Sequence, residues 1–335
     1  MTSAHDTPAH DTPAHDTPAR DTSAAPDLDV LVAGGGAAGL AAAVTLARSR
    51  RAVTVVDSGQ PRNAAAEGVH ALLGREGISP AELLAAGRGE VAGYGGEVRS
   101  GEITAVRRLE DGRFETTVST AEGETTLTAR RLLIATGLTD ELPDVPGLAE
   151  GWGRDVIHCP YCHGWEVRDR SILVLGTSPN SVHQALLFSQ LSADVRFLED
   201  TGRGPGLDAD QARMLAARGV EVVTGEAAGV ESGVRDGEDR LTGVRLSGGG
   251  LLSAEVVVVA PRMLARTEAF DSLGLRLEEN PMGQFLSVDP AGRTSVPGVW
   301  AAGNASDLSA QVGAAAAAGT MAGAQLNAEL VMEGL

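Results

Sequence analysis

The sequence predicts an α/β protein with two Rossmann-like dinucleotide-binding domains, each a three-layer ββα unit. Residues 28–57 show the order of a strand, a glycine-rich turn, a helix and a second strand that ends in an acid. This order is the one that dinucleotide binding requires. Residues 171–198 repeat the same order with a different turn. The chain of 335 residues is long enough for two hydrophobic cores.

The composition excludes several classes of function. Apolar residues make up 43% of the chain, and the formal net charge is −18. This charge argues against nucleic acid and against an anionic membrane surface, because both attract patches of basic residues. No apolar run approaches the roughly 20 residues of a membrane span. The N-terminus lacks the basic and apolar regions of a secretory signal, so we expect a cytoplasmic protein.

The N-terminal segment is a repeat with no core-forming residues. Residues 4–23 repeat a five-residue unit, three times as AHDTP and then as ARDTS. Such a segment buries too little apolar surface to offset the entropy of ordering its backbone. We therefore expect residues 1–27 to be a disordered tail, and we assign its histidines no metal-binding role.

The first glycine-rich turn has the pattern G-x-G-x-x-G. It runs from Gly34 to Gly39, directly after an apolar strand expected over 28–33. Gly34 permits a tight turn, Gly36 lets the backbone approach a pyrophosphate, and Gly39 lets the next helix pack on the strand. The pattern alone is weak evidence, because this chain is rich in Ala and Gly.

The elements after this turn strengthen the interpretation. A helix is expected over 40–49, and a second strand over 52–56 is followed by Asp57. The Asp57 carboxylate is placed to accept hydrogen bonds from a ribose. A glycine-rich turn without function would not explain this acid, so we predict that the unit binds a dinucleotide.

Local signals predict the elements between this unit and the cysteines. Arg62 and Asn63 are expected in a loop. Ser79 is suited to cap a helix, because its hydroxyl accepts a backbone N–H. Apolar runs separated by Asp-Gly and Glu-Gly turns predict a meander of strands. The expected elements are a helix over 80–94, strands over 97–109, 113–119, 125–127 and 131–135, the turn Thr136-Gly137, and a crossing between domains near Pro143, Pro146 and Gly147.

Both cysteines of the chain lie in residues 158–166, with the sequence HCPYCHGWE. Two sulfurs at C-x-x-C spacing meet across one turn. A cysteine that starts a helix has its thiolate stabilised by free backbone N–H groups. Such a pair cycles between dithiol and disulfide, and in the cytoplasm it is more often catalytic than structural. We therefore predict redox chemistry at Cys159 and Cys162.

Three other interpretations of this segment compete with the redox one. A zinc site would need two further ligands, and His158 and His163 are too close in the chain to converge with both sulfurs into a tetrahedron. Cys159 to His163 also matches C-x-x-C-H, the pattern of c-type haem attachment, but that chemistry requires export. Two buried structural cysteines are the remaining alternative. We predict no metal site.

The second βα unit keeps the frame of the first but not its glycines. A strand is expected over 171–175, a turn over 176–181 and a helix over 182–190. Ser178 stands where a pyrophosphate needs the middle glycine, and Pro179 removes a backbone N–H that would bind phosphate. We interpret this unit as a nicotinamide-type domain with a degenerate nucleotide site.

The residues after the next strand, expected over 194–198, support this interpretation. Glu199 and Asp200 lie where recognition of a 2′-phosphate needs a basic cluster, and Arg203 is the one arginine nearby. NADH binding stays open as the alternative, because the loss of a single glycine is survivable.

The C-terminal part completes the predicted fold. Further strands are expected over 220–224, 251–259 and 299–302. The last of them ends in a turn at Gly303 and Asn304, and Gln311 precedes a helix that continues to about Leu330. The small side chains of this helix allow it to pack closely on a flat cofactor or a strand.

These motifs together resemble the low-molecular-weight thioredoxin reductase family, in chain order and over residues 28–335. The resemblance implies a homodimeric flavoprotein with a thioredoxin reductase-like fold. Its discontinuous FAD domain would comprise residues 28–142 and 265–335, and a central domain, residues 143–264, would hold the cysteines. The FAD contacts that the resemblance implies are Gly34, Gly36, Gly39, Asp57, Arg62, Asn63, Thr136, Gly137, Gly303, Asn304 and Gln311.

The departures from this family are informative. His163 follows the second cysteine where the reductases have an acid, Asn304 replaces an Asp, and the second nucleotide site lacks its glycines and basic cluster. In these features the chain resembles one branch, the FAD-dependent dithiol oxidases that close disulfides in natural products such as gliotoxin and holomycin. This implies that Cys159 exchanges with a small-molecule dithiol, that Cys162 lies against the flavin, and that O2 accepts the electrons.

A base must deprotonate the substrate thiols, because only a thiolate attacks a disulfide. With an unperturbed pKa of about 6.5, a histidine suits this role at neutral pH. His163 adjoins Cys162 and is the first candidate, and His158 is the second. For either histidine the alternative is a packing role without chemistry.

Two other functions stay open. An NAD(P)H-dependent thioredoxin-disulfide reductase would run the electrons in the opposite direction, and the degenerate second turn argues against it. A flavin-bearing redox sensor would react once and would not turn over. The sequence does not identify the dithiol.

The purified protein is expected to carry FAD rather than FMN. The first glycine turn needs a pyrophosphate, and Asp57 needs the ribose of an adenylate half. Extraction of the cofactor and chromatography against FAD and FMN standards checks this expectation. Recovery of FMN alone would contradict the dinucleotide interpretation.

Overall fold

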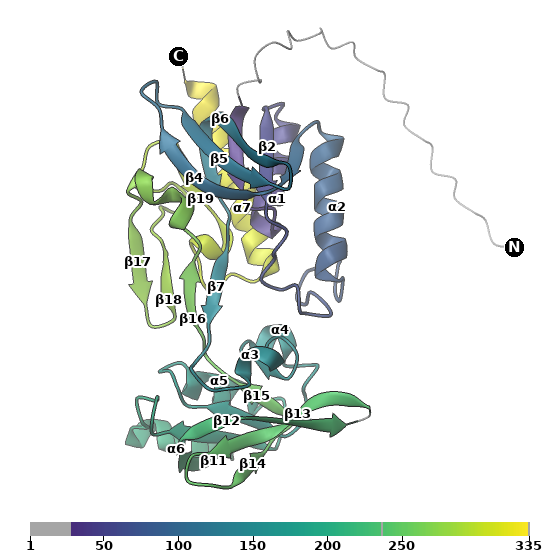
Figure 1. The fold of residues 1–335 in the computed structure, drawn as a ribbon, viewed down its shortest axis with the longest axis vertical. Helices are drawn as coiled ribbons and strands as arrows, with labels where there is room; N and C mark the ends of the chain where they lie inside the picture. The colour runs from purple at the N-terminus through teal and green to yellow at the C-terminus, as the bar shows by residue number, and fades with distance from the viewer. Residues whose placement is uncertain (1–27, 236, 334–335) are drawn as a thin grey trace, which may run out of the picture.

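The computed structural model describes residues 28–235 and 237–333, so the predicted tail over 1–27 lies outside the described residues. The chain forms two bodies that lie end to end (Figure 1). Two antiparallel strands, β7 (Leu138–Glu141) and β16 (Arg262–Ala265), lie where the bodies connect. The upper body therefore contains both ends of the described chain, and the lower body contains its middle.

The upper body is built on a sheet with the strand order β3-β2-β1-β6-β5-β4, and β19 also pairs with β6. Strands β2 and β6 flank β1 in parallel, whereas β5 pairs with β4 and β6 in antiparallel orientation. A smaller sheet, β17-β18-β16-β7, adjoins it. The elements are β1 (Leu28–Ala33), α1 (Ala37–Arg48), β2 (Val53–Asp57), α2 (Pro80–Gly93), β3 (Glu97–Ser100), β4 (Glu102–Arg108), β5 (Phe114–Thr120), β6 (Gly123–Ile134), η1 (Glu268–Leu273), β17 (Leu277–Asn280), β18 (Gly283–Leu286), β19 (Val299–Ala301), η2 (Gly303–Ala305) and α7 (Val312–Met332).

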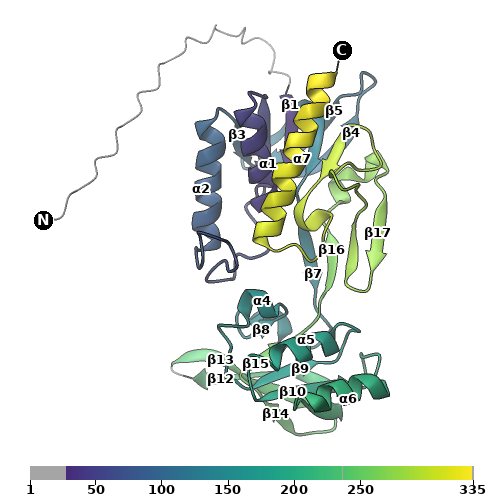
Figure 2. The ribbon, with the colours of Figure 1, turned by 180° about the vertical axis from the view of Figure 1, so that it is seen from behind.

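Strand β1 is buried on both faces of the upper sheet. Helices α1, α2 and α7 lie together on one face (Figure 2). Val30 and Val32 join the core with α1 and α7, whereas Leu31 and Ala33 join the core on the opposite face. A strand that is covered on both faces needs apolar residues where it is buried, which explains the apolar run from Val30 to Ala33.

The lower body repeats this architecture. Its parallel sheet has the strand order β11-β10-β9-β15-β8, and an antiparallel sheet, β12-β13-β14, covers part of it. The elements are α3 (Leu148–Gly151), β8 (Val156–Ile157), α4 (Pro160–His163), β9 (Ile172–Leu175), α5 (Ser181–Phe188), β10 (Val195–Asp200), α6 (Ala209–Ala217), β11 (Glu221–Gly225), β12 (Ala227–Arg235), β13 (Glu238–Leu246), β14 (Leu251–Ser253) and β15 (Val256–Val258).

Most predicted elements are found, with ends that differ by up to three residues. The strand predicted over 97–109 is wrong as one element, because β3 pairs with β2 and β4 pairs with β5. The predicted break between 125–127 and 131–135 is wrong, because β6 is continuous. The residues of the predicted break include Arg130, whose side chain pairs with Asp29 and Glu333. A polar stretch in the sequence thus marks a partly exposed part of the strand and not a turn.

The strand predicted over 251–259 is also wrong as one element. β14 pairs with β13 in the antiparallel sheet, whereas β15 lies between β8 and β9 in the parallel sheet. The chain changes sheets at Ala254 and Glu255. The Ala254 N–H donates to the Thr242 oxygen (3.1 Å), and the Glu255 carboxylate accepts the Ser171 N–H (3.2 Å). No local pattern in the sequence predicts these tertiary contacts.

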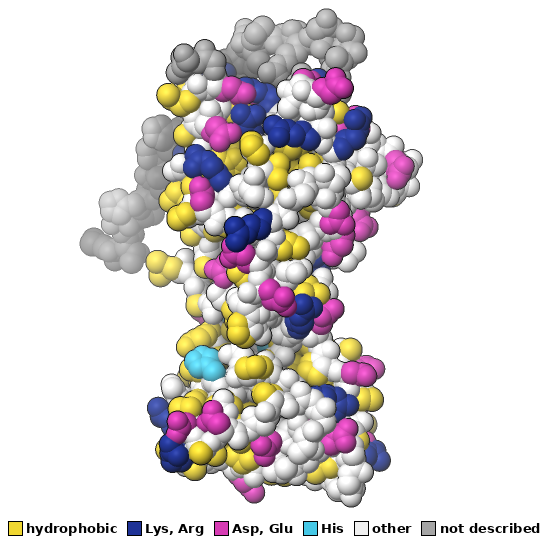
Figure 3. Space-filling model, turned by 90° about the vertical axis from the view of Figure 1, so that its left-hand side faces the viewer, with side chains coloured by type: hydrophobic (Ala, Val, Ile, Leu, Met, Phe, Trp, Pro, Cys, Tyr) yellow, Lys and Arg dark blue, Asp and Glu magenta, His cyan; other side chains and the backbone are white. Residues whose placement is uncertain are grey.

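Charged side chains of both signs are spread over both bodies, whereas hydrophobic side chains gather at the narrow junction (Figure 3). Within residues 28–235 and 237–333, no helix combines the length and the apolar character that crossing a bilayer requires.

Helices α1 and α7 pack through their backbones. A Cβ atom at Gly319 would lie 2.0 Å from the backbone oxygen of Ala38, and one at Gly323 would lie 2.9 Å from that of Ala42. Real Cβ atoms do not approach an oxygen this closely, so α7 needs glycine where it crosses α1. This contact holds the start of α7 near the first glycine turn.

Gly319→Ala is expected to lower the free energy of unfolding by about 1–3 kcal/mol, because the added methyl group overpacks the helix crossing. Gly89→Ala in α2 is the matched control. No atom lies within 4 Å of its added Cβ, and Ala is favoured over Gly in an exposed helix by up to about 1 kcal/mol. Denaturant unfolding of both variants measures the change in the free energy of unfolding, which is expected to have opposite signs in the two variants. A stabilised Gly319→Ala variant would contradict this packing.

Candidate functional site

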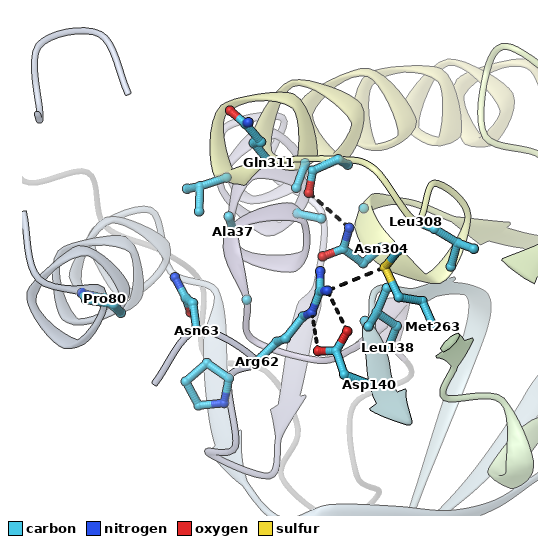
Figure 4. Close-up of a pocket in the computed structure, with 18 of the residues that line it drawn as sticks. Ala37, Arg62, Asn63, Pro80, Leu138, Asp140, Met263, Asn304, Leu308 and Gln311 are labelled. Atoms are coloured by element: carbon cyan, nitrogen blue, oxygen red, sulfur yellow. Dashed lines mark hydrogen bonds and ion pairs between the residues drawn. The ribbon is translucent and has the colours of Figure 1, made fainter. Parts of the chain in front are cut away.

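A large cavity extends from the first glycine turn to the cysteine segment, with a volume of about 1490 Å³. Both bodies and the loop over residues 58–79 line it. Figure 4 shows part of this lining, with Arg62 and Asn63 from the loop and Gln311 from the start of α7. Small-molecule pockets usually measure roughly 300–1,000 Å³, so this cavity has room for a dinucleotide and a small substrate.

The start of α1 has the features of an anion site. Gly36 is its N-cap, no side chain caps the helix, and the first turn holds no acid. A Cβ at Gly36 would meet no atom within 4 Å, so the backbone there is open to a ligand. The free N–H groups of the first turn point at this space. This end of the cavity therefore fits the pyrophosphate of FAD.

The other glycines of the turn have packing roles. Gly34 has a φ of 102°, and a Cβ there would lie 2.4 Å from the Ala135 oxygen. A Cβ at Gly39 would lie 1.9 Å from the Gly34 oxygen. Asp57 accepts a hydrogen bond from the Gly35 N–H (3.1 Å). Asp57 thus braces the turn as well as lining the cavity, a role that sequence reasoning missed.

The cavity brings together the residues predicted to contact FAD. Those that line it are Gly34, Gly36, Asp57, Arg62, Asn63, Thr136, Gly137, Gly303, Asn304 and Gln311. Gly39 is not among the lining residues, because it packs α1 on the turn. The assignment of each residue to a FAD atom stays a prediction.

Asn304 has a role that an acid could not fill. Its Nδ2 donates to the backbone oxygens of Asp307 and Ala310, both at 2.9 Å. An amide nitrogen supplies two donors, whereas a carboxylate supplies none. The departure from the reductase pattern at this position therefore stabilises the loop that leads into α7.

The cysteine segment forms a tight turn at the junction. Cys159 is the N-cap of α4, and the Gly164 N–H donates to the Pro160 oxygen at 2.9 Å. A Cβ at Gly164 would lie 2.1 Å from that oxygen, so the turn needs glycine there. Cys159 and Cys162 are half-buried free thiols, and both line the cavity.

The two thiols have opposite pKa shifts. A hydrogen bond from the Cys162 thiol, opposed by burial and aided by two backbone N–H groups and the Arg62 charge, lowers the pKa of Cys159 to about 7. The pKa of Cys162 is raised, because its S–H donates to Cys159 and because it is buried. Cys159 is therefore the thiolate near neutral pH, and Cys162 is its hydrogen-bond donor.

Arg62 lies between the predicted cofactor site and the cysteines. Its Nε and Nη2 donate to both carboxylate oxygens of Asp140, each at 2.7 Å (Figure 4). Its Nη2 also lies 3.4 Å from the Met263 sulfur and 3.4 Å from His158 Nε2. The sequence predicted Arg62 as an FAD contact. It did not predict Asp140, because Asp140 belongs to no sequence motif.

His158 is held as a neutral ring. Its Nε2 faces the Arg62 guanidinium, which can only donate, so Nε2 is the acceptor. The ring stacks on Trp152 with centroids 5.6 Å apart, and burial and the Arg62 charge lower its pKa to about 4. A base this weak is poorly matched to a thiol, so the structure disfavours His158 as the proton acceptor.

His163 has a different environment. Both of its ring nitrogens are buried, and neither has a hydrogen-bond partner among the described residues. Burial lowers its pKa, while the Glu166 carboxylate opposes this shift and His70 adds to it. The ring is therefore neutral near pH 7 and lines the same cavity as the thiols. Within the described ranges, no three His, Cys, Asp or Glu residues form a possible metal site.

The turn of the second βα unit is closed by its own chain. The loop over residues 201–207 rests on it, and a Cβ at Gly204 would lie 2.0 Å from the Gly176 oxygen. The cavity beside Ser178 and Pro179 measures about 10 Å³, which is close to the space of one water. The chain's own loop thus leaves little space beside this turn.

The two acids after β10 hold this loop. The Glu199 carboxylate accepts the Leu207 N–H (3.0 Å) and the Thr224 hydroxyl (3.1 Å). Asp200 is buried and accepts the Arg203 N–H (3.1 Å). The expectation that Asp200 faces a 2′-phosphate site is therefore wrong, because its side chain points into the lower body.

Comparisons with known proteins agree with this description. The sequence model of the family described as pyridine nucleotide-disulphide oxidoreductase matches residues 28–322. Thioredoxin reductase tcpT of Claviceps purpurea (strain 20.1) is 30% identical over 91% of this chain and 95% of its own length. Thioredoxin reductase sirT of Leptosphaeria maculans is 33% identical over 89% of this chain and 93% of its own length. The crystal structure of HlmI matches with a TM-score of 0.82 and 45% identity, over 91% of this chain and 93% of that chain.

Alkylation of the reduced protein by iodoacetamide is expected to label Cys159 first, with a rate that rises through about pH 7, following the pKa of about 7 at this thiol. Cys162→Ala removes the S–H donor that favours the Cys159 thiolate, so the midpoint should move to higher pH. Cys162→Ser keeps a donor and should move it less. Mass spectrometry of the labelled peptide measures both midpoints. Equal midpoints in the two variants would contradict the hydrogen bond.

Proposed function

Because the chain belongs to the pyridine nucleotide-disulphide oxidoreductase family, we propose that it is an FAD-dependent dithiol oxidase. Its substrate would be a small-molecule dithiol, in which it closes an intramolecular disulfide while O2 becomes hydrogen peroxide. The family confirms the broader predictions, which are a two-domain Rossmann-type fold, a flavin-dependent redox enzyme, and FAD as the cofactor.

The closed second nucleotide site is the observation that favours an oxidase over a reductase. A reductase must bind NAD(P)H beside the second βα turn, and there the Gly204 backbone touches Gly176. Pro179 lacks the N–H that would hold phosphate, and the Glu199 carboxylate faces the loop that closes the site. A nucleotide would have to displace this loop before it could bind. A substrate dithiol needs no such site, because it reaches the thiols through the large cavity.

The cavity supports the proposed position of FAD. The start of α1 would hold the pyrophosphate, Asp57 would hold the adenosine ribose, and the flavin would lie toward the cysteines. When bound, FAD supplies two-electron chemistry with a dithiol and with oxygen. We assign FAD binding to a domain of residues 28–142 and 265–335, and the cysteine pair to a central domain of residues 143–264. The chain crosses between the two bodies at β7 and β16, which supports these boundaries.

The thiol exchange follows from the two cysteines. In the oxidised enzyme Cys159 and Cys162 share a disulfide. A substrate thiol loses its proton to His163, and its thiolate attacks the Cys159 sulfur, so that Cys162 leaves as a thiolate. The second substrate thiolate attacks the mixed disulfide, so the product leaves as a disulfide and Cys159 leaves as a thiolate. The low pKa of Cys159 favours this departure.

The proposed surroundings of the enzyme follow the sequence expectations. We place it in the cytoplasm as a homodimer. Met321 and Met332 support a second copy on α7, because they are about half exposed or more and lie about three turns apart on one helix face. A thioredoxin reductase is the second candidate function, because tcpT and sirT carry that name.

Anaerobic mixing of the FAD-loaded protein with dithiothreitol is expected to bleach the flavin absorbance, whereas micromolar NADPH or NADH should bleach it slowly or not at all. Added oxygen should restore the absorbance and yield one hydrogen peroxide for each dithiol. Cys159→Ser is the control, since it keeps the cofactor cavity but cannot form the disulfide. Fast bleaching by NADPH, followed by transfer to a thioredoxin, would overturn the oxidase assignment.

A further inference from the structure

The loop over residues 58–79 places His70 between two carboxylates. His70 Nδ1 lies 2.7 Å from Glu76 Oε1 in the same loop. His70 Nε2 lies 3.5 Å from Glu166 Oε1, which belongs to the lower body. The contact at Nδ1 is a hydrogen bond, and the contact at Nε2 is within ion-pair distance. The imidazole therefore links the two bodies at the edge of the cavity, which it also lines.

The loop is built to hold this ring. The Ala71 N–H donates to Glu76 Oε2 at 2.9 Å, so both carboxylate oxygens are engaged. Ala71 adopts a φ of 57°, which is unusual for a residue with a side chain. A β-bridge between Val69 and Ile78 closes the loop behind them. The hydrogen bond from His70 is the main cause that lowers the pKa of Glu76. Glu76 thus orients His70 toward Glu166.

Glu166 is the carboxylate that acts on His163. It lies three residues after His163, on the turn that follows α4. His163 has no hydrogen-bond partner among the described residues, so its proton affinity depends on burial and on nearby charges. The charged or titratable groups that act on it are Glu166 and His70, and it in turn acts on His158. Of these groups, the Glu166 carboxylate is the one that favours the protonated His163 ring.

We propose that His70 is a positioning residue for thiol deprotonation. Glu76 holds the His70 ring, and the His70 ring keeps Glu166 beside His163. The proposal rests on the proposed function, in which His163 accepts the substrate proton. His70 itself touches no reacting atom in this role. Its contribution is to hold the Glu166 carboxylate at the edge of the site. The base of this site, His163, has no hydrogen-bond partner among the described residues.

The direction of one pKa change separates this role from a simple charge effect. As a nearby cation, His70 lowers the pKa of His163, so loss of its charge alone would raise that pKa. If His70 instead acts by holding Glu166 in place, its loss lets the carboxylate turn to solvent. The pKa of His163 then falls, because the group that opposes the effect of burial is gone.

NMR titration of the histidine rings in the FAD-loaded full-length protein tests the proposal, with the His163 signal assigned from His163→Gln. His70→Gln and Glu166→Gln are both expected to lower the pKa of His163. The double variant should lower it no further than Glu166→Gln alone. Glu76→Gln keeps the His70 ring but removes its support, so it should act in the same direction. Glu67→Gln, an exposed acid of the same loop, is the matched control.

The rate of flavin bleaching by dithiothreitol provides the second measurement. In His70→Gln the acid limb of the pH–rate profile should move to lower pH, and the plateau should fall roughly two- to fivefold, because a weaker base removes the proton less well. A pKa of His163 that rises or stays constant in His70→Gln would overturn the proposal. So would shifts that add in the double variant. The titration needs no turnover, so a wild-type protein that failed to oxidise dithiols would refute the proposed function separately.

Discussion

The chemistry of the cavity depends on one partly buried charge, the Arg62 guanidinium. Its side chain is 24% exposed and that of Asp140 is 6% exposed, and such a pair stabilises a site only when both partners are held in place. Loop 58–79 supplies the arginine and β7 supplies the acid. After burial, the Arg62 charge is the next cause of the low pKa of His158. It also adds to the Cys162 hydrogen bond in lowering the pKa of Cys159.

The two βα units show how one backbone frame reaches two outcomes. In the first, Gly36 leaves the start of α1 open, and the next strand ends in an acid that braces the turn. In the second, a glycine-rich loop folds back after β10, and Gly204 occupies the space above Gly176. Glu199 then bonds to this loop and not to a ligand. The small residues of a nucleotide turn therefore admit either a cofactor or the chain's own backbone.

Three histidines around the thiols differ through their neighbours. His158 is neutralised by burial and by the guanidinium beside it. His163 is buried without a hydrogen-bond partner among the described residues, and His70 is held between two acids. A cation beside a thiol pair stabilises the thiolate, and a neutral imidazole can accept a proton. The cavity thus combines a cation from Arg62 with a neutral ring at His163.

The sequence by itself determined the two βα units, the open first turn, the C-x-x-C pair and the degenerate second turn, because each depends on residues that are neighbours in the chain. It could not show that Arg62 meets Asp140, which is 78 positions away, or His158, which is 96 positions away. It also could not show that Asp200 turns inward or that Gly204 closes the second turn. Hydrophobic periodicity and turn chemistry act over a few residues, whereas the ionisation of a thiol or an imidazole depends on burial and on charges that only the folded chain brings within a few ångströms.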